Sequence, residues 1–208
     1  GSRATCCANG VCHLCPIDAK FTISNGVSAF ERSGVSLLTG VELHRVDIAN
    51  RRAVGAVLRD SSGAEVRLRS DTVALAANAI FNAAIMLRSD MADPALGRYL
   101  HEQTSRLLHL DVDHPNYFGG SSLTGHCYGF YDGPHRATSG AVLVENYNAP
   151  SALRTTRDRW THRMVLKLIA EDVPNAENRV MLDGDGAPAI TWNGHSAYGI
   201  AGLDRAQA

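Results

Sequence analysis

The sequence predicts an α+β fold in which antiparallel strands dominate, and three observations support this prediction. Short runs rich in β-branched residues recur along the chain, separated by turn-forming residues. One stretch in the first half passes from a continuous apolar run to a helical pattern. With 208 residues, of which 45% are hydrophobic, the chain is long enough to bury a core.

The first half of the chain opens with several strand-like runs. We expect strands at residues 35–38, 41–48, 54–60 and 65–69. The last two are separated by a turn sequence, Asp-Ser-Ser-Gly. Residues 54–69 therefore read as a β-hairpin.

A strand-turn-helix unit follows the hairpin. Residues 72–76 form a nearly continuous apolar run, which is typical of a parallel strand covered on both faces. Residues 79–88 carry apolar side chains at helical spacing, and Asn78 stands where a helix N-cap is expected. Pro94 and Gly97 then break the pattern, which places a domain boundary near residue 100.

The second half has a different pattern. Leu108, Leu110 and Val112 alternate with polar residues, as in a strand with one face in water. Gly- and Ser-rich turns are expected from 119 to 140. Further strands are expected at residues 141–144, 162–170, 179–182 and 189–192.

One apparent nucleotide motif lies between the last two of these strands. Residues 184–189 match the pattern G-x-G-x-x-A. In a dinucleotide-binding loop a helix must follow this pattern, whereas here a strand-like run follows it. We interpret the motif as a hairpin turn. The second half is therefore predicted to be mainly antiparallel β.

The charge balance argues against two classes of partner. Lys and Arg number 20 against 21 Asp and Glu, the formal net charge is -1, and the signs are mixed along the chain. No broad basic surface is predicted that would attract nucleic acid or an anionic membrane. The sequence contains no run of 18 or more apolar residues, so no membrane-spanning helix is predicted.

Four of the five cysteines lie within ten positions near the start. Cys6, Cys7, Cys12 and Cys15 follow the spacing C-C-x4-C-x2-C-P, whereas Cys127 stands alone. A disulfide scaffold would spread its cysteines along the chain. Clustered thiols with turn residues between them favour a loop around an iron–sulfur cluster. Zinc is an alternative that the adjacent cysteines fit poorly, and a local disulfide with spare thiols is a third.

Several segments together resemble a known family. They are CCANGVCHLCPIDAKFTISNG, LLTGVELHRVD, AVGAVLRDSSGAEVRLRSDTVALAANAIFNAAIMLRS, ALGRYL and PNAENRVMLDGDGAPAITW. Their order resembles that of the glucose-methanol-choline (GMC) flavoprotein oxidoreductases, and most closely the bacterial sugar and polyol dehydrogenase branch. The resemblance covers nearly the whole chain apart from about 107–158.

The resemblance implies two partial domains. Residues 1–99 would be the C-terminal part of a Rossmann-like FAD domain, with the cysteine-rich loop and a β-hairpin insertion. Residues 100–208 would be part of a mainly antiparallel β-sheet substrate-binding domain. The intact enzyme would transfer a hydride from the CH–OH carbon of a sugar, polyol or related alcohol to the flavin of FAD.

The resemblance also implies an iron–sulfur cluster, of the three-iron type, beside the flavin. Cys6, Cys7 and Cys12 would be its ligands, and electrons would pass on to a cytochrome-type acceptor. Cys15 would be a nearby thiol or a fourth ligand, because two residues rather than three separate it from Cys12. Members of this branch are often periplasmic, so the same location is expected here.

Four further residues resemble positions near the cofactor. Leu43 lies in the strand whose backbone contacts the FAD adenine, and Ala77 and Asn78 lie at a strand end that approaches the cofactor. Many members have Gly where this chain has Asn78. Lys20 is near the flavin edge by analogy. Ordinary interpretations stay open for each: a strand residue, a helix N-cap and a solvated lysine.

Two expected features of such an enzyme are not found in the sequence. It contains no G-x-G-x-x-G βαβ unit to hold the FAD pyrophosphate, and no segment carrying the family's catalytic His. We therefore assign no catalytic residue and expect an internal piece of a dehydrogenase that is inactive alone. The alternatives are a non-enzymatic iron–sulfur or zinc-binding electron-transfer or scaffold module, and a subunit that completes a flavin site with a partner chain.

Overall fold

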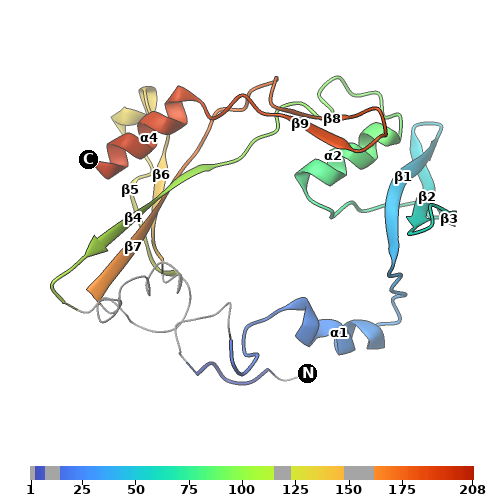
Figure 1. Ribbon diagram of the computed structural model, residues 1–208, viewed down its shortest axis with the longest axis horizontal. Helices are drawn as coiled ribbons and strands as arrows, with labels where there is room; N and C mark the ends of the chain where they lie inside the picture. Colours follow the sequence, from blue (N-terminus) through green and yellow to red (C-terminus); the bar gives the residue numbers. More distant parts are fainter. Residues whose placement is uncertain (1–2, 8–14, 115–122, 148–161) are drawn as a thin grey trace. The chain divides into compact units, whose positions relative to one another are not determined.

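The computed structural model describes residues 3–7, 15–114, 123–147 and 162–208 (Figure 1). These residues form helices and antiparallel sheets, which confirms the α+β class in its general form. The elements are, in chain order, α1 (Ile23–Arg32), β1 (Val41–Ala49), β2 (Arg52–Asp60), β3 (Glu65–Arg69), α2 (Ala79–Arg88), β4 (Thr104–Asp111), β5 (Leu123–Phe130), the 3-10 helix η2 (Pro134–Ala137), β6 (Val142–Tyr147), β7 (Arg163–Ala170), β8 (Arg179–Leu182), β9 (Pro188–Thr191) and α4 (Ala197–Gln207).

The chain divides into two compact units. The first, called here the meander unit, comprises Leu37–Glu102 and Pro174–Gly194; the second, the sheet unit, comprises Gly1–Ser36, Gln103–Val173 and His195–Ala208. The chain passes from one unit to the other between Glu102 and Gln103, close to the boundary predicted near residue 100. It also passes between the units at other points, so each unit combines stretches that are separated in the sequence. The β8–β9 segment belongs with the earlier residues because its backbone bonds to them. Val180 N donates to Gly97 O at 2.7 Å and Leu100 N donates to Asn178 O at 2.8 Å.

The meander unit contains a three-stranded antiparallel sheet in the order β1-β2-β3. The hairpin predicted at 54–69 is confirmed. The Asp60 carboxylate accepts hydrogen bonds from Ser62 N at 2.8 Å and Ala64 N at 3.0 Å, and Gly63 has a φ of 85° that favours glycine. The strand expected at 35–38 is wrong, because this apolar run finds no strand to pair with among the described residues.

The parallel strand expected at 72–76 is also wrong. The segment has no regular secondary structure and joins no sheet of the described residues. An apolar run indicates a tendency to be buried, but a strand forms only where a neighbouring strand completes its hydrogen bonds. The helix predicted at 79–88 is confirmed as α2, whose Ala84 and Ile85 are buried.

The predicted hairpin at the end of the meander unit is confirmed as β8–β9. Asp183 N donates to Ala187 O at 2.9 Å across its turn, and Gly186 has a φ of 78°. The G-x-G-x-x-A sequence is thus a turn between antiparallel strands, and no helix begins there.

The sheet unit is built on four antiparallel strands in the order β4-β7-β6-β5, three of which were predicted. Helix α4 packs on one face, where Leu203 joins a buried cluster with Val142, Val144, Leu168 and Ala170. The turns expected over 119–140 are wrong for part of that range, because residues 123–130 form β5. Two glycines interrupt this strand, but pairing with β6 supplies its hydrogen bonds, and shifts of register accommodate the glycines.

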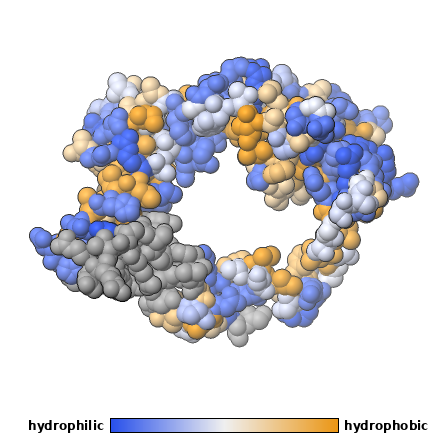
Figure 2. Space-filling model, in the orientation of Figure 1, coloured by the Kyte–Doolittle hydropathy of each residue, from blue (hydrophilic) through white to orange (hydrophobic). Residues whose placement is uncertain are grey.

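Helix α1 is amphipathic but carries no buried residue. Phe21 before it and Ile23, Val27 and Phe30 on it are exposed apolar side chains, and Figure 2 shows hydrophobic surface along this segment. Within the described parts of the chain, no helix is both long and apolar enough to cross a membrane.

Candidate functional site

The cysteine-rich segment is described only in part. Cys6 and Cys7 are exposed and Cys15 is half-buried, whereas Cys12 lies outside the described residues. The described residues contain no group of three or more His, Cys, Asp or Glu side chains arranged to hold a metal ion. The predicted ligand set is therefore not assembled by the described cysteines alone.

The Cys15 thiol lies in a pocket of backbone N–H groups. Ala19 N donates to Cys15 Sγ at 3.2 Å. The backbone N–H groups of Lys20, Ile17 and Ala19 together hold the pKa of this thiol below its usual value. Such donors stabilise a negative sulfur, which is the form that binds metals. Cys15 therefore fits the chemistry of a thiolate ligand, although the spacing alone left its role open.

The loop that forms this pocket is tied to α1 by Asn25. Its side-chain amide donates to Lys20 O at 2.8 Å and to Asp18 O at 3.3 Å, and its oxygen accepts from Thr22 N at 3.2 Å. The contribution of Lys20 to the pocket is thus its backbone N–H; its side chain is exposed. Sequence reasoning missed Asn25, because nothing in its spacing marks the backbone groups that it binds.

The other predicted cofactor residues lie in the meander unit. Asn78 caps α2: its side-chain oxygen accepts from Ile80 N and Phe81 N, both at 3.0 Å. Its φ of 105° is one that favours glycine. Ala77 N donates to Asn82 Oδ1 at 2.9 Å. Ala77 and Asn78 are therefore held by the local geometry at the start of the helix.

Leu43 is half-buried in β1, opposite Leu58 of β2. A register irregularity follows at once, between Leu43 and Arg45. In the described sheet β1 has a neighbour on one side only, so alternate backbone groups of this strand face away from β2. Such groups are the kind that could bond to an adenine ring.

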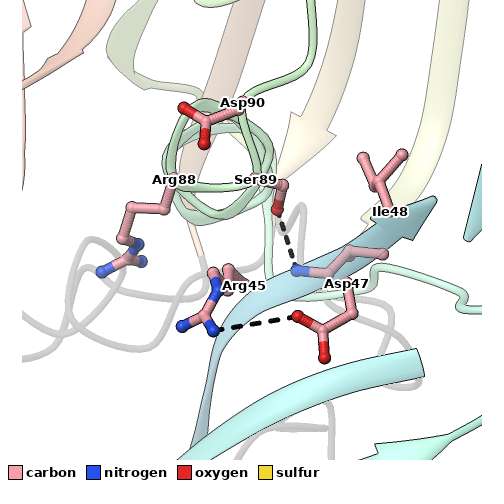
Figure 3. A pocket seen from close by; sticks show the side chains of 7 residues that line it. Arg45, Asp47, Ile48, Arg88, Ser89 and Asp90 are labelled. Carbon is pink, nitrogen blue, oxygen red and sulfur yellow. Dashed lines mark hydrogen bonds and ion pairs between the residues drawn. The ribbon is translucent and has the colours of Figure 1, made fainter. Parts of the chain in front are cut away.

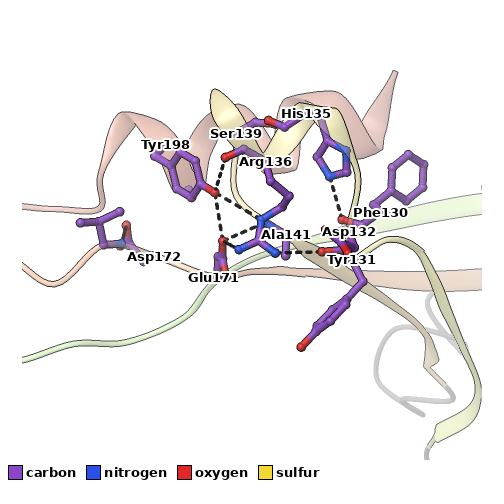
Figure 4. Close-up of polar contacts among 12 residues, drawn as sticks. Phe130, Tyr131, Asp132, His135, Arg136, Ser139, Ala141, Glu171, Asp172 and Tyr198 are labelled. Carbon is purple, nitrogen blue, oxygen red and sulfur yellow. Dashed lines mark hydrogen bonds and ion pairs between the residues drawn. The ribbon is translucent and has the colours of Figure 1, made fainter.

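A polar network that the sequence did not predict joins three elements of the sheet unit (Figure 4). Arg136 of η2 donates to the Glu171 carboxylate at 2.6 Å, and the Tyr198 hydroxyl of α4 donates to Arg136 O at 3.0 Å. Ala141 N also donates to Glu171, at 3.2 Å. The network fixes the end of β7 against the loop before β6 and the start of α4.

A second unpredicted cluster lies beside it. The buried carboxylate of Asp172 is 2.7 Å from His195 Nδ1 and accepts hydrogen bonds from Ser196 N and from the Ser196 hydroxyl. Burial by itself would raise the pKa of Asp172, but the bonds from Ser196 and His195 outweigh it and lower the pKa to about 2. Asp172 is therefore ionised across the physiological range.

The face of the sheet opposite α4 carries an open groove of about 320 Å³. Tyr131 and Glu145 line it together with the aliphatic side chains of Leu143 and Ile169. Tyr131 meets Tyr128 edge to face, with ring centroids 6.1 Å apart. Aromatic faces beside a carboxylate can take a hydroxyl-rich ligand, since the rings cover C–H surface while the carboxylate accepts O–H groups.

No model of a known protein family matches the chain, and no curated protein matches it either. The resemblance to GMC oxidoreductases stays a prediction.

Proposed function

We propose that this chain belongs to an FAD-dependent dehydrogenase of the GMC type, which oxidises the CH–OH group of a sugar, polyol or related alcohol. Its cysteine-rich segment holds an iron–sulfur cluster of the three-iron type that passes electrons to a cytochrome-type acceptor. The protein works in the periplasm. The meander unit belongs to the FAD domain and the four-stranded sheet to the substrate-binding domain.

The observation that carries this proposal is the environment of Cys15. Three backbone N–H groups stabilise a negative charge on its sulfur, in a loop that Asn25 holds in place. A structural thiol needs no such donors, whereas a thiolate that binds iron does. Cys6, Cys7 and Cys12 would hold the cluster, with Cys15 as a fourth ligand or an adjacent thiolate. A cluster there would supply one-electron transfer.

The flavin and substrate parts of the proposal have their own support. The outward backbone groups of β1 near Leu43 and the strained, glycine-like backbone at Asn78 agree with the positions that the resemblance brings close to FAD. Lys20 is close to the proposed cluster through its backbone N–H. The groove with Tyr131 and Glu145 suits an alcohol with several hydroxyl groups.

Metal analysis of the anaerobically purified protein tests the cluster. We expect iron and acid-labile sulfide, with an electron paramagnetic resonance signal of a three-iron cluster. Cys12→Ser should lose both. Cys127→Ser is the matched control and should keep them, since Cys127 lies exposed on β5, far along the sequence from the loop. Zinc in place of iron would favour the metal-binding module instead, and a metal-free protein with a disulfide in this segment would refute the cluster.

A separate measurement tests the dehydrogenase activity. Sugars or polyols should reduce an acceptor dye only when the whole flavin site is present. The assay therefore needs the FAD-loaded enzyme. A flavin-loaded protein that carries the cluster but oxidises no alcohol would leave the electron-transfer module as the better interpretation.

A further inference from the structure

A cleft of about 290 Å³ in the meander unit lies between β1 and the C-terminal end of α2 (Figure 3). This region, called here the arginine cleft, is lined by Arg45, Val46, Asp47, Ile48, Arg88, Ser89 and Asp90. None of these residues was predicted to have a function, and the proposed dehydrogenase activity uses none of them.

Arg88 is the unusual member of the cleft. Its side chain is only 11% exposed, and its Nε and Nη2 atoms are buried without a hydrogen-bond partner. The remaining nitrogen, Nη1, donates to Gly186 O at 3.4 Å. A guanidinium group carries five N–H donors, and leaving buried donors unsatisfied is unfavourable. The fork formed by Nε and Nη2 is the side of the group that matches an oxyanion in two places.

The nearest carboxylate does not fill this role. Glu42 Oε1 lies 3.9 Å from Arg88 Nη2, which is too long for a hydrogen bond, and the Glu42 side chain is 69% exposed. The Ser89 hydroxyl is already used, since it accepts from Val46 N at 2.8 Å and donates to Ile85 O at 2.6 Å. Within the described residues, no other group satisfies the two nitrogens.

A second cation lies close to Arg88. The guanidinium groups of Arg45 and Arg88 point to the same side of the cleft, and Asp90 projects away from both (Figure 3). Arg45 is held loosely, at 3.8 Å from Asp47 and 3.5 Å from Glu65.

The local potential is positive at His44, the residue before Arg45. Burial lowers the pKa of His44 most, and the charges of Arg59, Arg88 and Arg45 lower it further, against an opposing effect of Glu65. Arg45 and Arg88 share the lining of the cleft with Asp47 and Asp90, so the positive contribution is confined to the side where the two guanidinium groups lie.

We propose that the arginine cleft binds an oxyanion, the phosphate or carboxylate group of a small ligand, through the Nε and Nη2 atoms of Arg88. Arg45 adds a second positive charge on the same side of the cleft. The site lies wholly within the meander unit and does not depend on the cysteine-rich segment. It can therefore be tested whether or not the proposed function is correct.

Isothermal titration calorimetry on the full chain, first with inorganic phosphate and then with citrate at low ionic strength, tests this site. Saturable binding of phosphate alone identifies a phosphate site, and binding of citrate alone identifies a carboxylate site. Arg88→Met should weaken binding by roughly tenfold or more, because hydrogen bonds to a charged group are lost. Arg98→Met is the matched control, since Arg98 lies in the same unit but pairs with Glu177 at 2.8 Å, and it should leave the affinity unchanged.

A second variant keeps the test decisive if Arg88→Met misfolds. Glu42→Gln removes the competing carboxylate and should strengthen binding by roughly fivefold. Higher salt should reduce this difference, because Glu42 is exposed. The proposal is overturned if neither anion binds saturably to the wild-type chain, or if Arg88→Met and Glu42→Gln both bind as the wild type does.

Discussion

Replacing Asp172 with asparagine should remove a pH-dependent part of the stability of the sheet unit. The Asp172 side chain is 4% exposed and is bonded to His195 Nδ1 at 2.7 Å and to Ser196 N at 2.9 Å. Its pKa is lowered from 3.8 to about 2. A shift of this size corresponds to about 2 kcal/mol of stability at neutral pH.

The sign of the effect follows from the direction of the shift. Because the folded state lowers the pKa, the ionised Asp172 stabilises the fold fully at pH values well above 3.8, and this contribution is lost as the pH falls through about 2. Protonated aspartic acid and asparagine are similar in size and polarity. The difference in stability between wild type and Asp172→Asn should thus be largest near neutral pH and small near pH 2.

Chemical denaturation followed by circular dichroism, at a series of pH values from about 2 to 6, measures this difference. We expect Asp172→Asn to be less stable than wild type by about 2 kcal/mol at the upper end of the range. Asp93→Asn is the control: Asp93 is exposed and accepts the Ala95 N–H at 2.8 Å, a bond that asparagine can also accept, so this substitution should change the stability little. An Asp172→Asn difference that is the same at both ends of the range would refute the reasoning.

Three further predictions concern single positions. Asn78→Ala should lower the stability by about 2 kcal/mol, because it removes the helix cap and keeps the strained φ. Asn78→Gly should lower it by only a few tenths of a kcal/mol, and thermal denaturation compares the two variants. Gly202→Ala should destabilise by about 2 kcal/mol or more, since its Cβ would lie 2.6 Å from Gly140 O, while Gly184→Ala, with open space around it, should be tolerated in the same assay. Alkylation of Cys15, followed by mass spectrometry across pH, should show an apparent pKa below 9.0, and an apparent pKa at or above 9.0 would contradict the N–H pocket.

Elements stabilised by their own sequence were the predictable ones. The β2–β3 and β8–β9 hairpins carry their turn residues between paired strands, and α2 begins at the Asn78 cap. Residues 35–38 and 72–76 have a composition that similarly favours strands, but they form none. A strand also needs a neighbouring strand to pair with, and composition does not supply it. The reverse holds for β5, which forms through pairing with β6 although two glycines interrupt its sequence.

Two helices were missed although the sequence carried signals for them. Ser196 precedes α4 as an N-cap, and its hydroxyl accepts from Gly199 N at 3.1 Å. Ile23, Val27 and Phe30 lie on one face of α1 at helical spacing, but Gly26 and the serines around it obscure the pattern. For α4, the two glycines have a packing role, since Gly199 and Gly202 let the helix approach the neighbouring backbone.

The candidate sites were predictable only as residue types. Spacing alone predicted the cysteines as candidate ligands, because metal ligands in a loop must be close in sequence. It could not identify the donors around the Cys15 sulfur, which depend on how the following loop folds. Asp172 and His195 are 23 positions apart and meet only once β7 and α4 are in place. The sequence has no periodic signal for such a contact.

Arg88 shows why a buried charge can indicate binding rather than stability. An arginine in the last turn of a helix is favoured by the helix dipole, but an exposed side chain would serve equally well. Here Ser89 fixes the end of α2 against β1 through Val46 N, and the Arg88 side chain is enclosed with two donors unsatisfied. Burying a charge without full hydrogen bonding is unfavourable, and an apolar side chain of similar length would avoid that cost. A ligand that supplies the missing acceptors gives this arrangement a physical reason.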